Sequence, residues 1–320
     1  MNGLSSRSFS KSFLDRRSRF YDLRRVAPSK RHPRSPVLQF YSSSNNIGNF
    51  LPVLGIRKML GLDPDTWCIH DREIDFEFVN RNYRSIIIGG AGLFHPCFAP
   101  FWENLLKNCK VPMIIWGVGG CFLDGKKDSE VCRRTIAEAG KRCDLINVRD
   151  DISADFFQLS GAHLSACPTL AYLEGLKVSR NGPVLFSSHE KLVSDTETEE
   201  IRAMLQQLGK RFKYTTNEQS RFHGLDDIIL QDYGVSSIVV TTRLHGAIIA
   251  YALGIPYVAL PRDEKLRAFG RLYGNGILVE EVRELRDALL NISSQTMSPI
   301  ALSAVHEFGT LAKDWVLAHQ

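Results

Sequence analysis

The chain has 320 residues, of which 44% are apolar and 23% are charged, so it can build two domains with real cores. This composition excludes a globally disordered protein, and no apolar run reaches the roughly 20 residues of a membrane-spanning helix. Residues 1–36 contain ten Lys or Arg and two Asp, which gives them a net charge of +8. Because the whole chain has a net charge of +5, residues 37–320 have a net charge of −3. Because the remainder is acidic and shows no basic stripe, we expect no nucleic-acid partner.

Residues 1–36 form a Ser-, Arg- and Pro-rich tail that lacks the apolar core of a secretory signal. We expect a poorly ordered extension without a partner. The composition also has some transit-peptide character, and it would suit a flexible arm touching an anionic membrane. We therefore predict a cytoplasmic protein, either free or peripheral at the cytoplasmic face of a membrane.

The seven cysteines form no Cys-x-x-Cys pair and show no ligand spacing with histidine. Several fall inside apolar segments, which is typical of buried thiols in a reducing compartment. We predict no structural zinc site, no other metal and no cofactor.

Short apolar strands alternate with helices from residue 37 to residue 178. The strands are the runs "PVLQFY", "SIIIGG", "VPMIIWG" and "LINV". The helices are "NFLPVLGIRKMLG", "FAPFWENLLKNCK", "DSEVCRRTIAEAGKRCD" and "DISADFFQLSG", the last of which we expect Gly161 to end. Alternation of this kind indicates a parallel sheet covered on both faces.

The same pattern restarts after "GLKVSRNGP" at residues 175–183. Strands are predicted at "GPVLFSSH", "FKYTT", "SSIVVTT" and "IPYVALP". Helices are predicted at "DTETEEIRAMLQQLGKRF" with Asp195 as N-cap, at "GLDDIILQDYG", at "LHGAIIAYALG" ended by Gly254, and near 263–273, 280–291 and 299–318. The fold class is therefore α/β, with two doubly wound, Rossmann-like domains at 37–178 and 179–320. The last helix could pack back on the first domain.

Ligands in doubly wound proteins bind beyond the carboxyl ends of the strands, here in the cleft between the two halves. Polar and glycine residues follow several predicted strands at that edge: Asn45–Asn49, Gly89–His95, Gly117–Gly120, Arg149–Asp150 and Arg243–Gly246. Their shared position argues for a site more strongly than any single motif does.

Arg243 and His245 lie at the start of the helix that begins near Leu244. The N-terminus of a helix already carries positive dipole charge, so cations there are unfavourable unless an anion binds. The structural alternative pairs Arg243 with a carboxylate such as Asp150 and has His245 cap a backbone carbonyl. We favour the anion, and Gly246 would allow it to approach closely.

Other groups at the same edge have more than one interpretation. Arg149 could form a local pair with Asp150, and Lys265 and Arg267 could belong to a solvated helix face. Glycine loops expose backbone amides but are usually just tight turns. A small substrate that carries both phosphate and carboxylate nevertheless suits the positively charged set at this edge, which is Arg149, Arg243, His245 and Lys265. Candidate acid or base groups are Glu103, His95 and His189.

The block "TTRLHGAIIAYALGIPYVAL" with a following Lys, together with "GGAGLF", "WGVGG" and "NVRDDIS", resembles the polysaccharide pyruvyl transferases. The resemblance runs from about residue 37 to about residue 275. Its most specific part is Arg-Leu-His-Gly with the downstream Gly-Ile-Pro. Two positions depart from the family pattern. Asn46-Ile47-Gly48-Asn49 stands in place of Asn-x-Gly-Asp, and Thr169 in "ACPTLAYL" stands where an acid is common.

The resemblance implies a fold like that of B-type glycosyltransferases, no metal, and phosphoenolpyruvate as donor. The acceptor would be two hydroxyls of a sugar in a polysaccharide, an oligosaccharide or a lipid-linked precursor, and the product a cyclic ketal. His245, as imidazolium, would protonate the donor with Arg149 and Arg243 as its catalytic partners, and His95 or Asp150 could deprotonate the sugar. The donor site would comprise Arg149, Arg243, Leu244, His245, Gly246 and Lys265. Acceptor or loop contacts would be Asn46, Gly48, Gly90, Gly92, His95, Gly117 and Gly119.

A sugar-nucleotide-dependent glycosyltransferase on the same architecture is the other functional hypothesis. It would use the helix at Leu244 to hold a diphosphate. The sequence lacks an obvious arrangement for stacking a base and binding a ribose, which disfavours this hypothesis.

Overall fold

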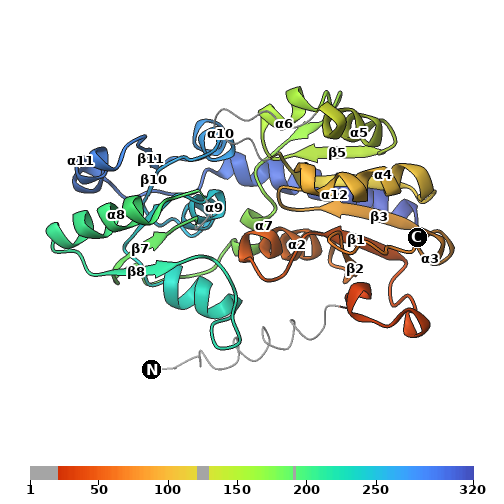
Figure 1. Cartoon of the computed structure of the whole chain (residues 1–320), viewed down its shortest axis with the longest axis horizontal. Coiled ribbons are helices and arrows are strands. Elements are labelled where there is room, and N and C mark those ends of the chain that lie inside the picture. The colour runs from red at the N-terminus through yellow and green to blue at the C-terminus, as the bar shows by residue number, and fades with distance from the viewer. Residues whose placement is uncertain (1–20, 121–129, 190–191) are drawn as a thin grey trace.

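The computed structural model describes residues 21–120, 130–189 and 192–320, with the side chains of 130–132 left out. Two α/β domains lie side by side, each built around one parallel sheet (Figure 1). Most of the strands are the predicted ones, because they are short apolar runs that can be covered on both faces.

The N-terminal sheet has the order β2-β1-β3-β4-β5-β6, and all its strand pairs are parallel. Its strands are β1 (Val37–Tyr41), β2 (Asp65–Cys68), β3 (Ser85–Gly89), β4 (Met113–Val118), β5 (Leu145–Val148) and β6 (His163–Leu164). The strand order reverses between β1 and β3. Strands β2 and β6 were not predicted, because "DTWC" is short and polar and β6 has only two residues.

The helices of this domain are α2 (Ile47–Leu60), α3 (Phe76–Asn82), α4 (Ala99–Asn108), α5 (Glu130–Lys141), α6 (Asp151–Phe156) and α7 (Thr169–Leu173), with a 3-10 turn, η3, at Pro96–Phe98. The prediction that the "DISADFFQLSG" helix runs to Gly161 is wrong. Helix α6 ends at Phe156, and Gly161 (φ 72°) belongs to the turn that follows.

The C-terminal sheet has the order β11-β10-β9-β7-β8 and is also parallel throughout. Its strands are β7 (Val184–Ser187), β8 (Phe212–Thr215), β9 (Ile238–Thr241), β10 (Tyr257–Ala259) and β11 (Ile277–Leu278). The strand order reverses between β7 and β9. Both domains are therefore doubly wound, as the sequence predicts.

The helices of this domain are α8 (Asp195–Gln207), the π-helix η4 (Asp227–Tyr233), α9 (Leu244–Ala252), α10 (Glu264–Leu272), the turn η5 (Val282–Glu284) and α11 (Leu285–Asn291). Ser194, not Asp195, is the N-cap of α8, since Ser194 Oγ accepts from the amide of Glu197 at 3.1 Å. Asp195 lies in the first turn, where its charge suits the helix dipole.

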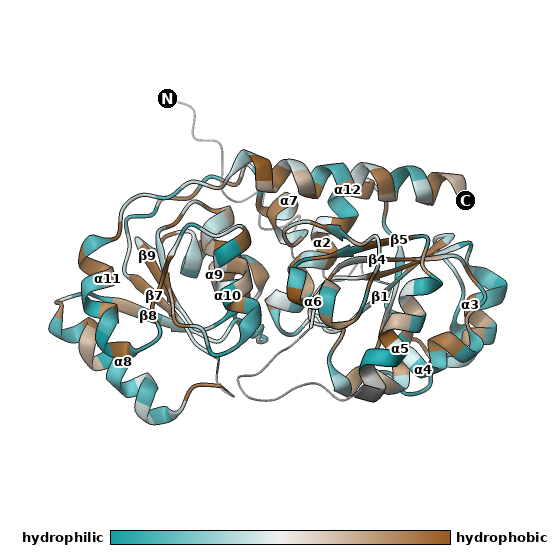
Figure 2. Ribbon diagram, turned by 90° about the horizontal axis from the view of Figure 1, so that it is seen from above, coloured by the Kyte–Doolittle hydropathy of each residue, from teal (hydrophilic) through white to brown (hydrophobic). Residues whose placement is uncertain are grey.

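The final helix α12 (Pro299–Ala318) returns to the N-terminal domain, where it runs beside α2 and α7 (Figure 2). The ring of Phe308 packs 5.5 Å from that of Trp116, and Trp315 Nε1 donates to Asp144 at 2.9 Å. One apolar cluster also combines residues of α2, α7 and α9. The two domains therefore share a core beneath the cleft, which holds the facing strand ends together.

Residues 21–36, expected to be part of a poorly ordered tail, instead pack on the N-terminal domain. They form two short turns, η1 (Leu23–Arg25) and η2 (Pro28–Lys30). Leu23 is fully buried, and Asp22 accepts a hydrogen bond from Tyr41 at 2.7 Å. Residues 1–20 lie outside the described part of the chain.

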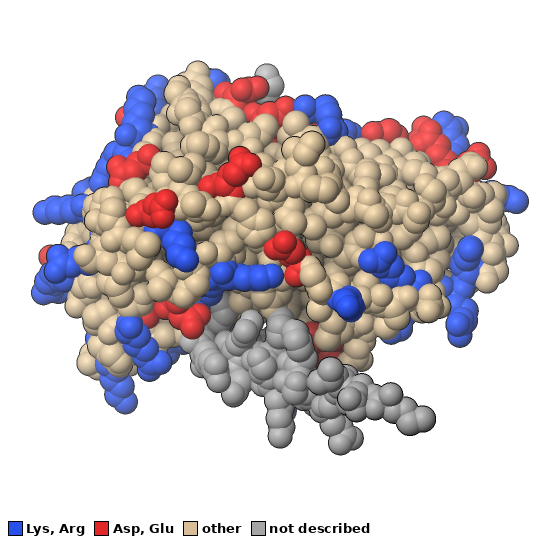
Figure 3. Space-filling model, turned by 180° about the vertical axis from the view of Figure 1, so that it is seen from behind, with Lys and Arg blue, Asp and Glu red and all other residues tan. Residues whose placement is uncertain are grey.

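Charged side chains are mixed on the face shown in Figure 3, where Lys and Arg lie among Asp and Glu. None of the helices in the described ranges combines the length and the apolar character needed to cross a membrane.

Candidate active site

A cavity of about 230 Å³ lies at the carboxyl ends of the two sheets, where the domains face each other. In each sheet, residues at the point where the strand order reverses line this cavity. In the N-terminal sheet these are Ser42 after β1 and Gly92 after β3. In the C-terminal sheet they are His189 after β7 and Arg243 after β9. This is where doubly wound proteins bind ligands. The lining residues are Ser42, Asn46, Asn49, Gly92, His95, Phe98, Arg149, His189, Asn217, Arg243, Leu244, His245 and Lys265.

Arg243 is the N-cap residue of α9 and has extended backbone geometry. Its amide donates to Thr241 Oγ1 at 2.9 Å, and its Nε donates to the carbonyl of Ser188. These bonds hold the guanidinium beside the first turn of α9. Gly246 packs on the strand below, because a Cβ there would lie 2.1 Å from Thr241 Oγ1. Gly246 therefore serves helix packing and does not line the cavity.

The ring of His245 lies between the two domains. A Cβ on Gly48 of α2 would come within 2.7 Å of His245 Nδ1, and Cys167 Sγ lies 3.7 Å from Nε2. Burial first, and then the charges of Arg149, Lys265 and Arg243, hold the pKa of His245 well below its ordinary value. The imidazole is therefore neutral at pH 7 unless an anion offsets these charges.

Arg149 follows β5 and is only 6% exposed. Its Nε and Nη1 atoms are buried and have no hydrogen-bond partner in the described part of the chain. The nearest carboxylate oxygen in an ion pair with it is Asp150 Oδ2, 3.9 Å from Nε. A buried cation with unmet donors is costly unless a ligand completes its hydrogen bonds.

Gly119 makes room for the Arg149 guanidinium, whereas Gly92 only lies in contact with it. A Cβ on Gly119 would lie 2.7 Å from Arg149 Nε, whereas one on Gly92 would lie 3.6 Å from Nη2. Gly119 therefore positions the arginine from behind, and Gly92 lines the cavity beside it.

Asp150 caps helix α6, because its Oδ1 accepts from the amide of Ser153 at 2.7 Å. Burial raises the pKa of this carboxyl, and the neighbouring Arg149 acts in the opposite direction. Asp150 does not line the cavity, so its position suits a structural role better than that of a sugar base.

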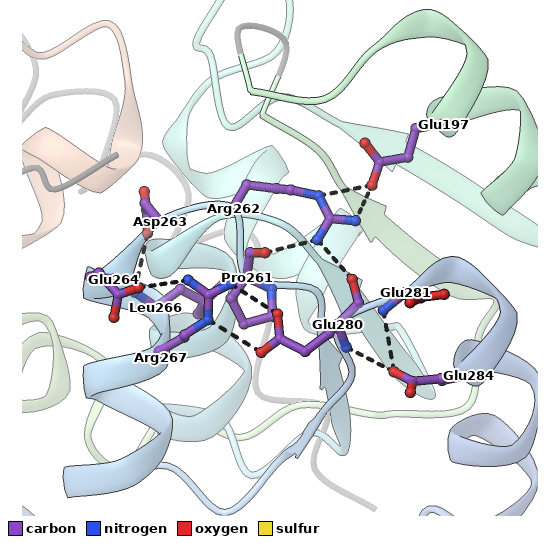
Figure 4. Close-up of polar contacts among 10 residues, drawn as sticks. All are labelled: Glu197, Pro261, Arg262, Asp263, Glu264, Leu266, Arg267, Glu280, Glu281 and Glu284. Atoms are coloured by element: carbon purple, nitrogen blue, oxygen red, sulfur yellow. Dashed lines mark hydrogen bonds and ion pairs between the residues drawn. The ribbon is translucent and has the colours of Figure 1, made fainter. Parts of the chain in front are cut away.

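Lys265 reaches the cavity from the first turn of α10, and its Nζ lies 2.7 Å from Asp263 Oδ2. Asp263 also caps α10 by accepting from the amide of Leu266 at 3.2 Å. Figure 4 shows the ion pairs that fix this helix start, with Arg262 on Glu197 and Arg267 between Glu264 and Glu280. Arg267 thus belongs to a network outside the cavity, whereas Lys265 points into it.

The candidate acid and base groups differ in their surroundings. His95 Nδ1 accepts from the amide of Cys97 at 3.1 Å, which leaves the proton of the neutral ring on Nε2. His95 is therefore arranged to donate to a ligand rather than to take a proton from one. Burial, with Arg243 and Lys265 nearby, lowers the pKa of His189 to about 4, so this ring is neutral. Glu103 is exposed and does not line the cavity.

Two predicted loop contacts serve the backbone instead of a ligand. Gly90 has φ 82°, and a Cβ on it would lie 2.6 Å from Pro52. Gly117 has φ 65° at a register shift between β4 and β5, and a Cβ on it would lie 2.5 Å from Pro168. Neither lines the cavity, and packing against the two prolines accounts for both glycines.

The cavity also includes Ser42, Phe98 and Asn217, which were not predicted, and Asn49, which was predicted only as part of the strand-end set Asn45–Asn49. Asn217 follows β8 and has φ 60°. The rule that placed the other residues at the strand ends would have found it. Asn46, which was predicted, caps α2 by accepting from the amide of Gly48 at 2.8 Å.

Two facing doubly wound sheets with a cationic cavity between them define a two-domain α/β protein of the B-type glycosyltransferase fold. Similar solved structures include a UDP-GlcNAc 2-epimerase from Methanocaldococcus jannaschii, with a TM-score of 0.52 and 12% identity over 86% of this chain and 99% of that one. The S. aureus MnaA-UDP co-structure matches with a TM-score of 0.51 and 11% identity over 80% and 88%. At such identities the likeness concerns the fold alone.

Residues 46–264 match the family model for polysaccharide pyruvyl transferase, and the chain belongs to that family. The match includes Arg149, Arg243 and His245 and ends one residue before Lys265. No curated protein matches the sequence. Within the described ranges, no group of three or more His, Cys, Asp or Glu side chains could hold a metal ion.

Proposed function

We propose that this pyruvyl transferase uses phosphoenolpyruvate as donor and joins the pyruvyl group to two hydroxyls of one sugar as a cyclic ketal. The sugar would belong to a polysaccharide or to its lipid-linked precursor. The observation that carries the proposal is Arg149, a buried cation with unmet donors that lines the cavity together with Arg243, Lys265 and the start of α9. A small ligand with both phosphate and carboxylate groups would satisfy all of them.

The donor would lie against the first turn of α9. Amide groups there, together with the dipole, favour an anion, and the forked guanidinium groups of Arg149 and Arg243 suit phosphate and carboxylate oxygens. Lys265, kept in place by Asp263, adds a third positive charge. Burial, and then the three cations, depress the pKa of His245. The donor would neutralise the cations and raise this pKa, so that the ring can become protonated.

Protonated His245 would transfer its proton to the methylene carbon of the donor, and positive charge would develop on the adjacent carbon. One sugar hydroxyl attacks that carbon, the carbon–oxygen bond to phosphate breaks with its electron pair, and a second hydroxyl closes the ring. Of the two hydroxyl protons, one returns to His245 and the other leaves with phosphate as hydrogen phosphate. General acid catalysis of this kind typically contributes ~10²- to 10⁴-fold to the rate.

Other lining residues would position the acceptor. His95 would donate through Nε2, and Asn46 and Asn49 would offer amide groups from the opposite wall. We assign His189, a neutral ring, to pass the second hydroxyl proton on to the departing phosphate, since Asp150 is engaged in capping α6.

The test uses phosphoenolpyruvate labelled with ¹³C at its central carbon, the purified protein, and a panel of free and lipid-linked oligosaccharides. Mass spectrometry and NMR should find the label in a product as a ketal carbon, with release of one phosphate per label. Competing nucleotide sugars should not inhibit. Transfer of a sugar from a nucleotide, with no labelled product from phosphoenolpyruvate, would show the glycosyltransferase hypothesis to be right instead.

A further inference from the structure

The cavity is too small to hold an extended saccharide. Its volume of about 230 Å³ lies below the ~300–1,000 Å³ of ordinary small-molecule sites. Phosphoenolpyruvate and one sugar ring would fill it. Membership of the family implies a polysaccharide acceptor. The neighbouring sugars of such an acceptor must therefore lie against the protein surface at the mouth of the cavity.

Two loops from different domains join beside that mouth. The amide of Ile47 donates to the carbonyl of Asn217 at 2.9 Å, and Asn46 Nδ2 donates to Glu218 at 2.6 Å. The amide of Gln219 continues the pairing by donating to the carbonyl of Asn45 at 2.7 Å. Because Asn46 and Asn217 line the cavity, the residues next to them along both loops form its border.

We call this border the cleft rim and define it as Arg25, Ser44, Asn45, Gln219, Arg221 and Phe222. Arg25 joins it through Nη2, which donates to Ser44 Oγ at 3.4 Å, and its side chain is 68% exposed. Gln219 also donates to the carbonyl of Ser44. In Figure 1 the loop that carries Gln219, Arg221 and Phe222 extends between β8 and the π-helix at Asp227–Tyr233.

Phe222 is 89% exposed, more than any other large apolar side chain in the described part of the chain. A single exposed apolar residue is ordinary, so the exposure alone carries no weight. The backbone on both sides is fixed, because the amides of Phe222 and His223 both donate to Ser220 Oγ and His223 pairs with Asp232 at 2.7 Å. The guanidinium of Arg221 lies 5.6 Å from the Phe222 ring.

We propose that the cleft rim is the subsite for the sugars of the acceptor that lie next to the one receiving the pyruvyl group. The flat ring of Phe222 presents an apolar face to the C–H face of a pyranose. Arg25 and Arg221 present donors to its hydroxyls or to acidic substituents. Because the turn that carries Phe222 is already fixed, less conformational entropy is lost when a ligand binds to its ring. This favours a role for Phe222 in binding the acceptor. This inference rests on the proposed function.

Phe222 lies five residues from Asn217, so the two Cα atoms are at most about 17 Å apart. An oligosaccharide can reach across such a distance, whereas a monosaccharide bound in the cavity cannot. The subsite should therefore distinguish oligosaccharides from monosaccharides while leaving the donor unaffected.

The experiment compares Phe222→Ala and Arg221→Ala with the unchanged protein on free oligosaccharides of increasing length from one series. Binding is first measured by saturation-transfer NMR without donor, and then KM and kcat are measured with phosphoenolpyruvate. Ile300→Ala is the matched control, because Ile300 is 81% exposed but belongs to the first turn of α12 and not to the rim. We expect Phe222→Ala to weaken binding and raise KM roughly two- to tenfold for oligosaccharides only, the range of one lost aromatic contact. The KM for phosphoenolpyruvate and the control should not change.

Unchanged oligosaccharide binding in both rim variants would overturn the proposal, as would an equal loss for monosaccharides. Binding of the rim variants to vesicles of phosphatidylcholine with phosphatidylserine is measured as well. If the rim variants lose vesicle binding but keep oligosaccharide binding, the rim contacts a membrane and the proposal is wrong. If no acceptor receives a pyruvyl group from phosphoenolpyruvate, the proposed function fails. The NMR measurement still decides whether the rim binds saccharide.

Discussion

A methyl group added at Gly48 would press directly on the His245 ring. The new Cβ of Gly48→Ala would lie 2.7 Å from His245 Nδ1 and 2.8 Å from Cγ, whereas ordinary contacts begin at 3.4 Å. The ring must therefore move by about 0.7 Å, or α2 must shift by a similar amount. Misplacement of a catalytic group by about 1 Å can cost ~10²-fold in rate, so we expect kcat to fall roughly 10- to 100-fold.

The stability of this variant should change far less than its activity. Alanine favours a helix over glycine by ~0.5–1 kcal/mol, while overpacking costs ~1–3 kcal/mol. The net loss in the free energy of unfolding should then be about 2.5 kcal/mol or less. Gly309→Ala is the control, because its Cβ would come within 2.8 Å of Met59 Sδ in α2, away from the cavity. It should show a similar loss of stability with normal kcat.

The assays are steady-state kinetics with phosphoenolpyruvate and thermal unfolding of both variants. If Gly48→Ala keeps a normal kcat while its fold is intact, the position of the His245 ring does not limit turnover. That result would refute the assignment of His245 as the proton donor. Equal losses of kcat in both variants would show that general overpacking, not the ring position, is responsible.

Two further predictions concern the donor site. Arg149→Ala should raise the Kd of phosphoenolpyruvate about 10- to 100-fold, which matches the loss of charge-assisted hydrogen bonds of ~1.5–3 kcal/mol. Arg81→Ala, at a 72% exposed arginine in α3, should leave that Kd unchanged, and equal effects in calorimetry would contradict the role of Arg149. Turnover should also survive treatment with a chelator, because the proposed chemistry uses only cationic side chains. A loss of turnover that Mg²⁺ or Mn²⁺ restores would show this prediction to be wrong.

The sequence predicted the cavity through one physical rule. Parallel strands point their carboxyl ends to the same edge, so residues that follow different strands meet there even when far apart in the chain. This rule brought Arg149, Arg243, His245 and Lys265 together with Asn46. It depends only on recognising apolar strands, which the periodicity of the sequence reveals.

Other features depend on contacts that no local pattern encodes. Gly90 and Gly117 occupy strand ends like the ligand-facing residues, but their conformations serve packing against Pro52 and Pro168. The ordered residues 21–36 depend on Leu23 entering a distant core and on the bond from Tyr41 to Asp22. The N-cap of α8 was predicted at Asp195 but is Ser194. An error of one residue is usual when helix boundaries are predicted from sequence.

The depressed pKa of His245 provides a direct link between donor binding and catalysis. Without a bound anion the ring is neutral near pH 7, because burial and the charges of Arg149, Lys265 and Arg243 disfavour its protonated form. A multiply charged anion reverses this balance and raises the pKa. Binding of phosphoenolpyruvate should therefore take up protons from the solution. Burial first, and then Lys265, also lowers the pKa of His95, and burial with Arg243 and Lys265 lowers that of His189. These two rings can therefore add to the uptake.

The decisive measurement is the calorimetric titration of phosphoenolpyruvate into the protein at pH 7 in buffers of different ionisation enthalpy. The dependence of the observed heat on buffer gives the number of protons taken up. The account predicts binding at one site with uptake of up to one proton at His245, and His245→Gln should bind the donor while losing most of that uptake. Absence of binding, or the same uptake in His245→Gln as in the unchanged protein, would contradict the claim that this cavity holds the donor and protonates it through His245.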